Sequence, residues 1–199
     1  MCPPDASDSV DEPLIRSGEL LSRATSRLLV IDVQQKLVPL IPNASRLIAL
    51  CRRLVEAAQI LGVPVYATEQ YPQGLGATVI ELAEVLGKRP AKLRFSCVET
   101  LDWGVASGQG GERFQVVVVG IEAHVCILQT VLDLLAQGYQ VFVAADAVGS
   151  RGELDCTLAL DRMAGAGAII TTSESVMFEW CEVAGTPEFK KISQMLKGG

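Results

Sequence analysis

Short apolar runs rich in valine and isoleucine recur along this 199-residue chain, and they constrain its fold more than any other feature. Each run is nearly continuous rather than alternating, which is typical of strands that are covered on both faces. The runs are RLLVIDV (27–33), VPVYAT (63–68), QVVVVG (115–120), YQVFVAAD (139–146) and AIITT (168–172). A shorter strand is expected near residues 91–93.

Helical patterns separate these runs. Asn43 can cap a segment whose apolar residues recur at helical spacing and which Gly62 would end. Further helices are expected at 124–137, at 153–165, at 174–182 and from Thr186 onward. Because parallel neighbours need crossover connections, this alternation predicts an α/β fold, a Rossmann-like arrangement of three αβα layers around a parallel sheet.

Size and charge narrow the class of protein further. The length predicts one domain over residues 26–199, preceded by a flexible arm over residues 1–25 that is rich in proline, serine and aspartate. With 17 basic and 23 acidic residues the net charge is −6, so we expect neither nucleic acid nor an anionic membrane as a partner. No apolar run approaches the roughly 20 residues of a membrane span.

The six cysteines are scattered without a CxxC pair, which argues against both a disulfide framework and a zinc site. Reduced thiols in a cytoplasmic protein are the simpler interpretation. Cys97 is expected close to the strand ends, where it could line a pocket.

Polar residues at the carboxyl ends of the strands carry the functional information, because ligands of open parallel sheets bind there. Asp32 lies near the end of the first strand, where an unpaired carboxylate would be costly, so it needs a partner. From the strand alone, a structural role and a catalytic role are equally open. Lys92 follows at the third strand, but Arg89 and Arg94 flank it, and spacing alone does not distinguish the three cations.

Cys126 occupies the segment GIEAHVCILQT that follows the fourth strand. It is expected in the first turn of the next helix, where the helix dipole and free amides favour a thiolate, and a nearby lysine would add to this effect. A buried core thiol is the alternative, since free cysteine is among the most buried residues. His124, the only histidine, is two positions away and should point elsewhere, so we expect it at the surface or an interface.

The motifs VIDVQ, KLRFS and GIEAHVCILQT occur in the order and at the spacing found in the isochorismatase-like cysteine hydrolases, the superfamily that includes the nicotinamidases. The chain resembles this superfamily over about residues 27–195. The loop TEQYPQGLG and the segment TTSES at 171–175 look closest to the isochorismatase domain-containing branch. The resemblance implies a six-stranded sheet of order 3-2-1-4-5-6 and a catalytic triad of Asp32, Lys92 and Cys126.

The resemblance also implies a cis peptide between Ile121 and Glu122. The backbone amides of Glu122 and Cys126 would then form an oxyanion hole. Asp32 would take the thiol proton, Lys92 would stabilise the thiolate, and Cys126 would attack a small amide or a related C–N bond through a thioester-type intermediate.

A small-molecule substrate is therefore the expected partner. The side chains expected to line its pocket are Gln34, Tyr71, Leu75, Phe95 and Ser96. Nicotinamidases hold a metal with aspartate and histidine between the second strand and the catalytic lysine, whereas residues 66–91 contain neither residue type. We therefore predict no metal and no cofactor.

Two other functions compete with this one. The chain could be a catalytically idle scaffold that acts as a binding or interaction protein. A nucleotide-binding oxidoreductase is less favoured, because DVQQKLVPL after the first strand contains no GxGxxG. The helix at 124–137 is apolar on more than one face, which predicts a homo-oligomer.

Overall fold

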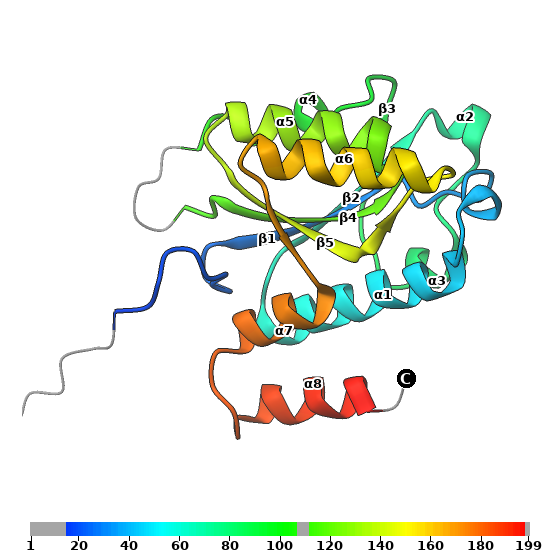
Figure 1. The fold of residues 1–199 in the computed structure, drawn as a ribbon. Helices are drawn as coiled ribbons and strands as arrows, with labels where there is room; N and C mark the ends of the chain where they lie inside the picture. The colour runs from blue at the N-terminus through cyan, green and yellow to red at the C-terminus, as the bar shows by residue number, and fades with distance from the viewer. Residues whose placement is uncertain (1–14, 107–111, 198–199) are drawn as a thin grey trace, which may run out of the picture.

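A six-stranded parallel sheet of order β3-β2-β1-β4-β5-β6 forms the centre of the protein, as the resemblance implied (Figure 1). The computed structural model describes residues 15–106 and 112–197. The strands are β1 (Ser26–Ile31), β2 (Val65–Gln70), β3 (Ala91–Lys92), β4 (Gln115–Ile121), β5 (Gln140–Gly149) and β6 (Ile169–Thr171). Each pair of neighbouring strands in this sheet runs parallel.

Helices cover both faces of the sheet and complete the three layers that the sequence predicted (Figure 1). One face carries α1 (Ala44–Leu61), α3 (Ile80–Ala83) and α7 (Ser173–Cys181), with α8 (Pro187–Lys197) packed outside α1 and α7. The other face carries α4 (Val98–Leu101), α5 (Leu128–Ala136) and α6 (Glu153–Gly165). Short turns η1 (Val38–Leu40) and α2 (Pro72–Leu75) follow β1 and β2.

The continuous valine run of β4 is explained by two cores. Every residue of β4 is buried. Val117 and Val119 pack into the core under α1 and α7, while Val116 and Val118 pack into the core under α5 and α6. Because each fully buried valine contributes about 1.5–3 kcal/mol relative to an exposed one, a central strand gains from apolar residues on both faces.

Two helix ends differ from the sequence prediction. Gly62 ends α1 in the left-handed conformation, as predicted. Asn43 precedes α1, but it is itself left-handed (φ 54°) and its side chain makes no capping hydrogen bond. The helix expected from residue 124 begins as a π-helical turn, η2 (Ala123–Ile127), before α5 starts at Leu128.

The breadth of the apolar face of α5 is partly explained by contacts within the chain. Its buried side chains face the sheet, and α4 and α6 pack against its flanks. The homo-oligomer therefore stays a prediction. No helix in the described part of the chain is long and apolar enough to cross a membrane.

The described part of the expected N-terminal arm is attached to α7. The backbone N–H of Leu21, which is buried, donates to the Glu179 carboxylate at 2.8 Å. Arg16 pairs with Glu182 at 2.8 Å and donates to the carbonyl of Glu179 at 2.7 Å. The arm was predicted over residues 1–25. Its first part, residues 1–14, lies outside the described residues.

Close contact between β4 and β1 generates a testable prediction. Gly120 has φ +135°, and a Cβ there would lie 2.2 Å from the carbonyl oxygen of Ile31. We expect Gly120→Ala to lower the free energy of unfolding by about 3 kcal/mol or more, because both the backbone conformation and the strand spacing must change. Urea unfolding measures this change.

Gly165 provides the control, since a Cβ there has no neighbour within 4 Å. Gly165→Ala should change the free energy of unfolding by less than about 1 kcal/mol. Equal effects of the two substitutions would contradict the close contact as the cause.

Candidate active site

Three side chains from three strand ends meet at the carboxyl edge of the sheet. Asp32 follows β1, Lys92 ends β3, and Cys126 lies in η2 after β4. Lys92 Nζ donates to Asp32 Oδ2 at 2.7 Å, and the two side chains are 1% and 0% exposed. The Cys126 thiol, in a residue that is 4% exposed, lies 3.9 Å from Gln70 Oε1 and close enough to the ion pair for both charges to shift its pKa. The structure thus brings together the three residues that the resemblance singled out.

Neighbouring strands hold Asp32 in place. Its backbone is left-handed (φ 55°), which turns the chain out of β1, and its N–H donates to the carbonyl of Thr68 at 3.3 Å. The Thr68 hydroxyl donates to Oδ1 at 2.8 Å, so both carboxylate oxygens have a partner. A buried ion pair is tolerated when its remaining polar atoms are satisfied in this way.

The Lys92 ammonium is fully satisfied as well. Besides Asp32, it donates to Gln70 Oε1 at 2.7 Å and to the carbonyl of Phe95 at 2.8 Å, which uses all three of its protons. The two flanking arginines lie elsewhere: Arg89 pairs with Glu69 at 3.4 Å, and Arg94 pairs with Glu99 at the surface at 2.7 Å. This distinguishes the cations that spacing alone could not.

Gln70 is a site residue that the sequence reasoning missed. Its Nε2 donates to the carbonyl of Leu93 at 2.8 Å, which fixes the amide so that Oε1 faces both Lys92 and, at 3.9 Å, the sulfur of Cys126. The available signal was its position, since a polar residue at the carboxyl end of β2 follows the same rule that drew attention to Asp32.

Gln34 holds the end of β2. It is fully buried, and its Oε1 accepts from the N–H of Gln70 at 2.8 Å. Its Nε2 donates to the carbonyls of Gln70 and Gly76, at 3.0 and 2.6 Å. These bonds use both ends of the amide, so Gln34 lies behind the site and not on an open wall.

The other expected pocket residues lie nearer to solvent. Tyr71 and Phe95 are 50% and 48% exposed, and Leu75 and Ser96 are half-buried. Phe95 and Ser96 line a cleft of about 670 Å³ between the loop after β3 and helices α4 and α5. The three triad residues do not line this cleft, but the carbonyl of Phe95 connects its wall to the Lys92 ammonium.

The turn between β4 and η2 corrects the expected cis peptide. No peptide bond among residues 15–106 and 112–197 is cis, so the bond between Ile121 and Glu122 is trans. The chain turns instead because Glu122 adopts a left-handed conformation, with φ 60° and ψ 61°. Its carbonyl accepts from the N–H of Val125 at 3.0 Å. The oxyanion hole of the Glu122 and Cys126 amides stays a prediction.

The side chains of this turn contact one another and the loop after β5. The buried Glu122 carboxylate lies 2.8 Å from Arg151 Nε and 3.4 Å from His124 Nδ1. His124 Nδ1 is also 3.1 Å from the hydroxyl of Ser150 in the loop after β5. His124 is therefore engaged with Glu122 and that loop.

The protonation state of Cys126 differs from the expected thiolate. Burial and the charge of Asp32 raise the pKa of the Cys126 thiol well above its usual range, and the Lys92 ammonium offsets only part of this rise. Burial lowers the pKa of Lys92, but the negative charge around the ammonium, that of Asp32 included, raises it by more, so the ammonium keeps its charge. The resting site therefore holds a neutral thiol beside a carboxylate–ammonium pair.

The buried ion pair should contribute far more to stability than a surface pair of the same length. Lys92→Met leaves the Asp32 carboxylate buried without its cation, so we expect a loss of about 3–5 kcal/mol in the free energy of unfolding. The double variant Asp32→Asn/Lys92→Met should recover part of that loss, because the uncompensated charge is gone.

Arg94→Met breaks the exposed 2.7 Å pair with Glu99 and is the matched control, expected to cost about 0–1 kcal/mol. Similar losses for Lys92→Met and Arg94→Met in urea unfolding would contradict the role of burial.

Buried thiols should make the fold sensitive to alkali. Burial raises the pKa of Cys97 to about 11 and that of Cys51 to about 12, from a usual value of 9.0, with smaller contributions from Asp32 and Asp146 respectively. A raised folded-state pKa gives stability that is present below about pH 9 and is lost as the pH rises through the folded value.

The free energy of unfolding should therefore fall between pH 9 and 11 more steeply in the wild type than in the variant Cys51→Ala/Cys97→Ala. Urea titrations across this range measure both slopes. Parallel slopes would mean that these thiols are not the cause.

Comparison with known proteins identifies relatives of this chain. The family model described as Isochorismatase domain matches residues 26–175. Isochorismatase domain-containing protein 1 of Danio rerio is 42% identical over 180 residues, covering 89% of this chain and 62% of that protein. This chain therefore spans less than two thirds of that relative's length. Isochorismatase domain-containing protein 2A of Mus musculus is 41% identical, with 90% of this chain and 86% of that protein covered.

A solved structure has the same fold at similar identity. The structure named MAR1 ribonuclease from Caenorhabditis elegans superposes with a TM-score of 0.79 at 39% identity, covering 89% of this chain and 92% of that one. The family match, the identities and the shared fold lead to the same conclusion. The chain belongs to the isochorismatase domain family.

Proposed function

We propose that this protein is a cysteine hydrolase that cleaves a small amide or a related C–N bond with Asp32, Lys92 and Cys126. One observation carries the proposal: Gln70 Oε1 joins the two parts of the site, since it lies 2.7 Å from the Lys92 ammonium of the buried ion pair and 3.9 Å from the sulfur of Cys126. A carboxylate that stays charged beside a neutral thiol is suited to act as its general base.

Acylation follows from this arrangement. As the Cys126 sulfur attacks the carbonyl carbon, Asp32 accepts the thiol proton and the carbonyl electron pair moves to oxygen. The backbone amides of Glu122 and Cys126 are the proposed donors to this oxyanion. Asp32 then gives the proton to the amide nitrogen, the C–N bond breaks, and the amine leaves a thioester behind.

Deacylation reverses these roles. A water molecule gives one proton to Asp32 while its oxygen attacks the thioester carbon. The sulfur leaves, recovers the proton from Asp32, and the carboxylic acid is released. Lys92 transfers no proton in either step. Its positive charge stabilises the transient thiolate and holds the Asp32 carboxylate in position.

The name of the Caenorhabditis elegans structure raises a second possibility, RNA cleavage. The net charge of −6 disfavours it, because binding of a phosphate backbone depends on basic side chains. A thiol flanked by a carboxylate is also better suited to acyl transfer than to phosphoryl transfer. A small substrate, a cytoplasmic location and a homo-oligomeric assembly remain our expectations for this chain.

Cys126→Ala tests the proposed function. On a panel of small primary amides scored by ammonia release, we expect kcat/KM for any hydrolysed amide to fall on the order of a thousandfold or more, because the nucleophile is lost. Intact-mass analysis of the wild type should detect an acyl adduct that maps to Cys126. Cys156→Ala, which removes a thiol on α6, is the control and should keep full turnover.

Two results would overturn the proposal. Full turnover by Cys126→Ala would exclude the thiol as nucleophile. An absence of both turnover and adduct across the panel, with Cys126 also inert to small electrophiles, would favour the idle scaffold.

A further inference from the structure

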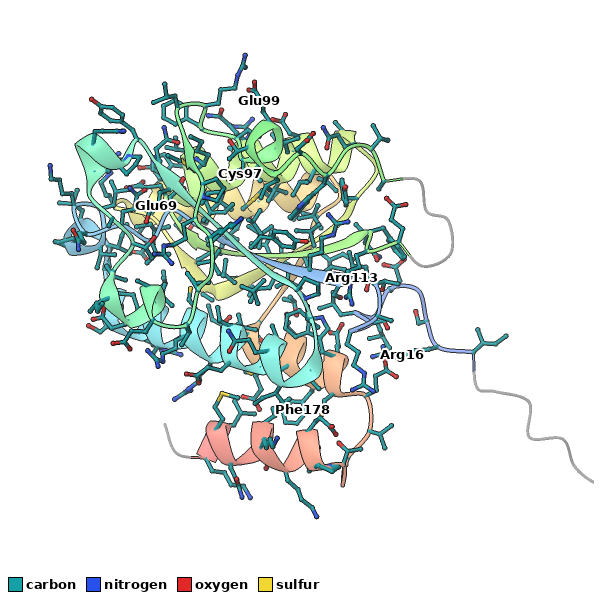
Figure 2. The ribbon with its side chains drawn as sticks, turned by 180° about the vertical axis from the view of Figure 1, so that it is seen from behind. Arg16, Glu69, Cys97, Glu99, Arg113 and Phe178 are labelled. Atoms are coloured by element: carbon teal, nitrogen blue, oxygen red, sulfur yellow. The ribbon has the colours of Figure 1, made fainter. Side chains whose placement is uncertain are left out.

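A second buried thiol lies within the site. Cys97 immediately precedes α4, is fully buried, and lies inside the molecule between the sheet and the helices (Figure 2). Its Sγ is 3.3 Å from Thr68 Oγ1. Its N–H donates to Thr130 Oγ1 at 3.0 Å, and the Thr130 hydroxyl donates to the carbonyl of Cys126 at 2.6 Å. Cys97 is thus fixed relative to both the base and the nucleophile.

The donors and acceptors along this chain of contacts can be assigned. The Thr68 hydroxyl has a single proton and donates it to Asp32 Oδ1 at 2.8 Å, since a carboxylate only accepts. In the contact between Thr68 and Cys97 the thiol must then be the donor. Burial raises the pKa of Cys97 to about 11, so the thiol keeps the proton that this role requires.

We propose that Thr68 and Cys97 are positioning residues that hold Asp32 ionised through a hydrogen-bond relay to Oδ1, so that the proton stays on Cys126 until a substrate arrives. A donor to the ionised carboxylate favours that form, and a thiol that donates to the hydroxyl strengthens the hydroxyl as a donor. The inference rests on the proposed function, because it explains how two neighbouring residues control Asp32, the general base of the proposed reaction.

The relay of Thr68 and Cys97 acts on a different oxygen of Asp32 from the ion pair. Lys92 faces it from β3, Thr68 from β2, Cys126 from η2, and Cys97 acts on it from the turn before α4. Lys92 contributes a full charge on Oδ2, whereas the relay acts on Oδ1. Removing the relay therefore changes the balance between Asp32 and Cys126 without removing the ion pair.

The rate at which iodoacetamide alkylates Cys126, followed by mass spectrometry from pH 4 to 9, tests the relay. When Asp32 holds the proton that it shares with Cys126, the sulfur is a thiolate and reacts. Thr68→Val should therefore raise the plateau alkylation rate about tenfold and move the midpoint of the acidic limb of the pH profile up by about one pH unit. Below the midpoint its rate should match the wild type, because both groups are protonated there.

Conservative variants distinguish the loss of a hydrogen-bond donor from the loss of side-chain packing. Cys97→Ala should change the profile in the same direction by about threefold, a smaller effect because it acts through Thr68. Thr68→Ser and Cys97→Ser keep a hydroxyl donor and should restore the wild-type profile. If Thr68→Val does not fold, as judged by its melting transition, the pair Cys97→Ala and Cys97→Ser carries the test.

Each outcome decides between the hypotheses. Variant profiles identical to the wild type, or rates raised by the same factor at every pH, would overturn the relay and leave the proposed function intact. Folded wild-type protein whose Cys126 is not alkylated at any pH would overturn the proposed function itself.

Discussion

The ion pair between Lys92 and Asp32 is the interaction on which the site depends. It joins β3 to β1 across the end of β2, and β2 supplies most of the hydrogen bonds that make its burial tolerable: Thr68 satisfies the carboxylate and Gln70 accepts from the ammonium. Gln34 then fixes Gln70 from behind. Two charges removed from water are kept only where their partners are this complete, so the polar residues at the end of β2 serve chiefly to support the pair.

Burial and this pair together determine the state of the sulfur. Burial raises the pKa of the Cys126 thiol most, and the neighbouring carboxylate raises it further, so the thiol is neutral at rest. A neutral thiol is a poor target for adventitious oxidation or alkylation, since the thiolate is the reactive form. The nucleophile that we propose is therefore formed when an electrophilic carbon is in place and Asp32 can take the proton.

The sequence predicted the framework better than it predicted the chemistry of the site. Valine-rich runs and helical spacing specify a parallel sheet with helices on both faces, because a strand covered on both faces and a helix buried on one face each leave a local apolar pattern. The resemblance supplied the strand order and the three site residues.

Gln70 and Thr68 were missed because their roles depend on the register between β1 and β2, which brings Asp32 beside them. The thiolate expectation failed because the helix dipole is a local effect, whereas the burial of Cys126 is a property of the whole fold. The expected cis bond was wrong because a left-handed Glu122 makes the same turn.

Non-glycine residues in the left-handed region follow three of the strands directly: Asp32 after β1, Tyr71 after β2 and Glu122 after β4, with φ values of 55°, 37° and 60°. Each conformation costs on the order of 1 kcal/mol relative to an unstrained residue. Replacing Asp32 with glycine would relieve this cost, but it would leave the buried Lys92 ammonium without its anion, which is a larger loss of about 3–5 kcal/mol. Heat resistance is better sought at Asp102, which is left-handed at the end of α4 and lies outside the triad. At the carboxyl edge of this sheet, backbone strain that costs stability therefore lies in a residue that the site needs.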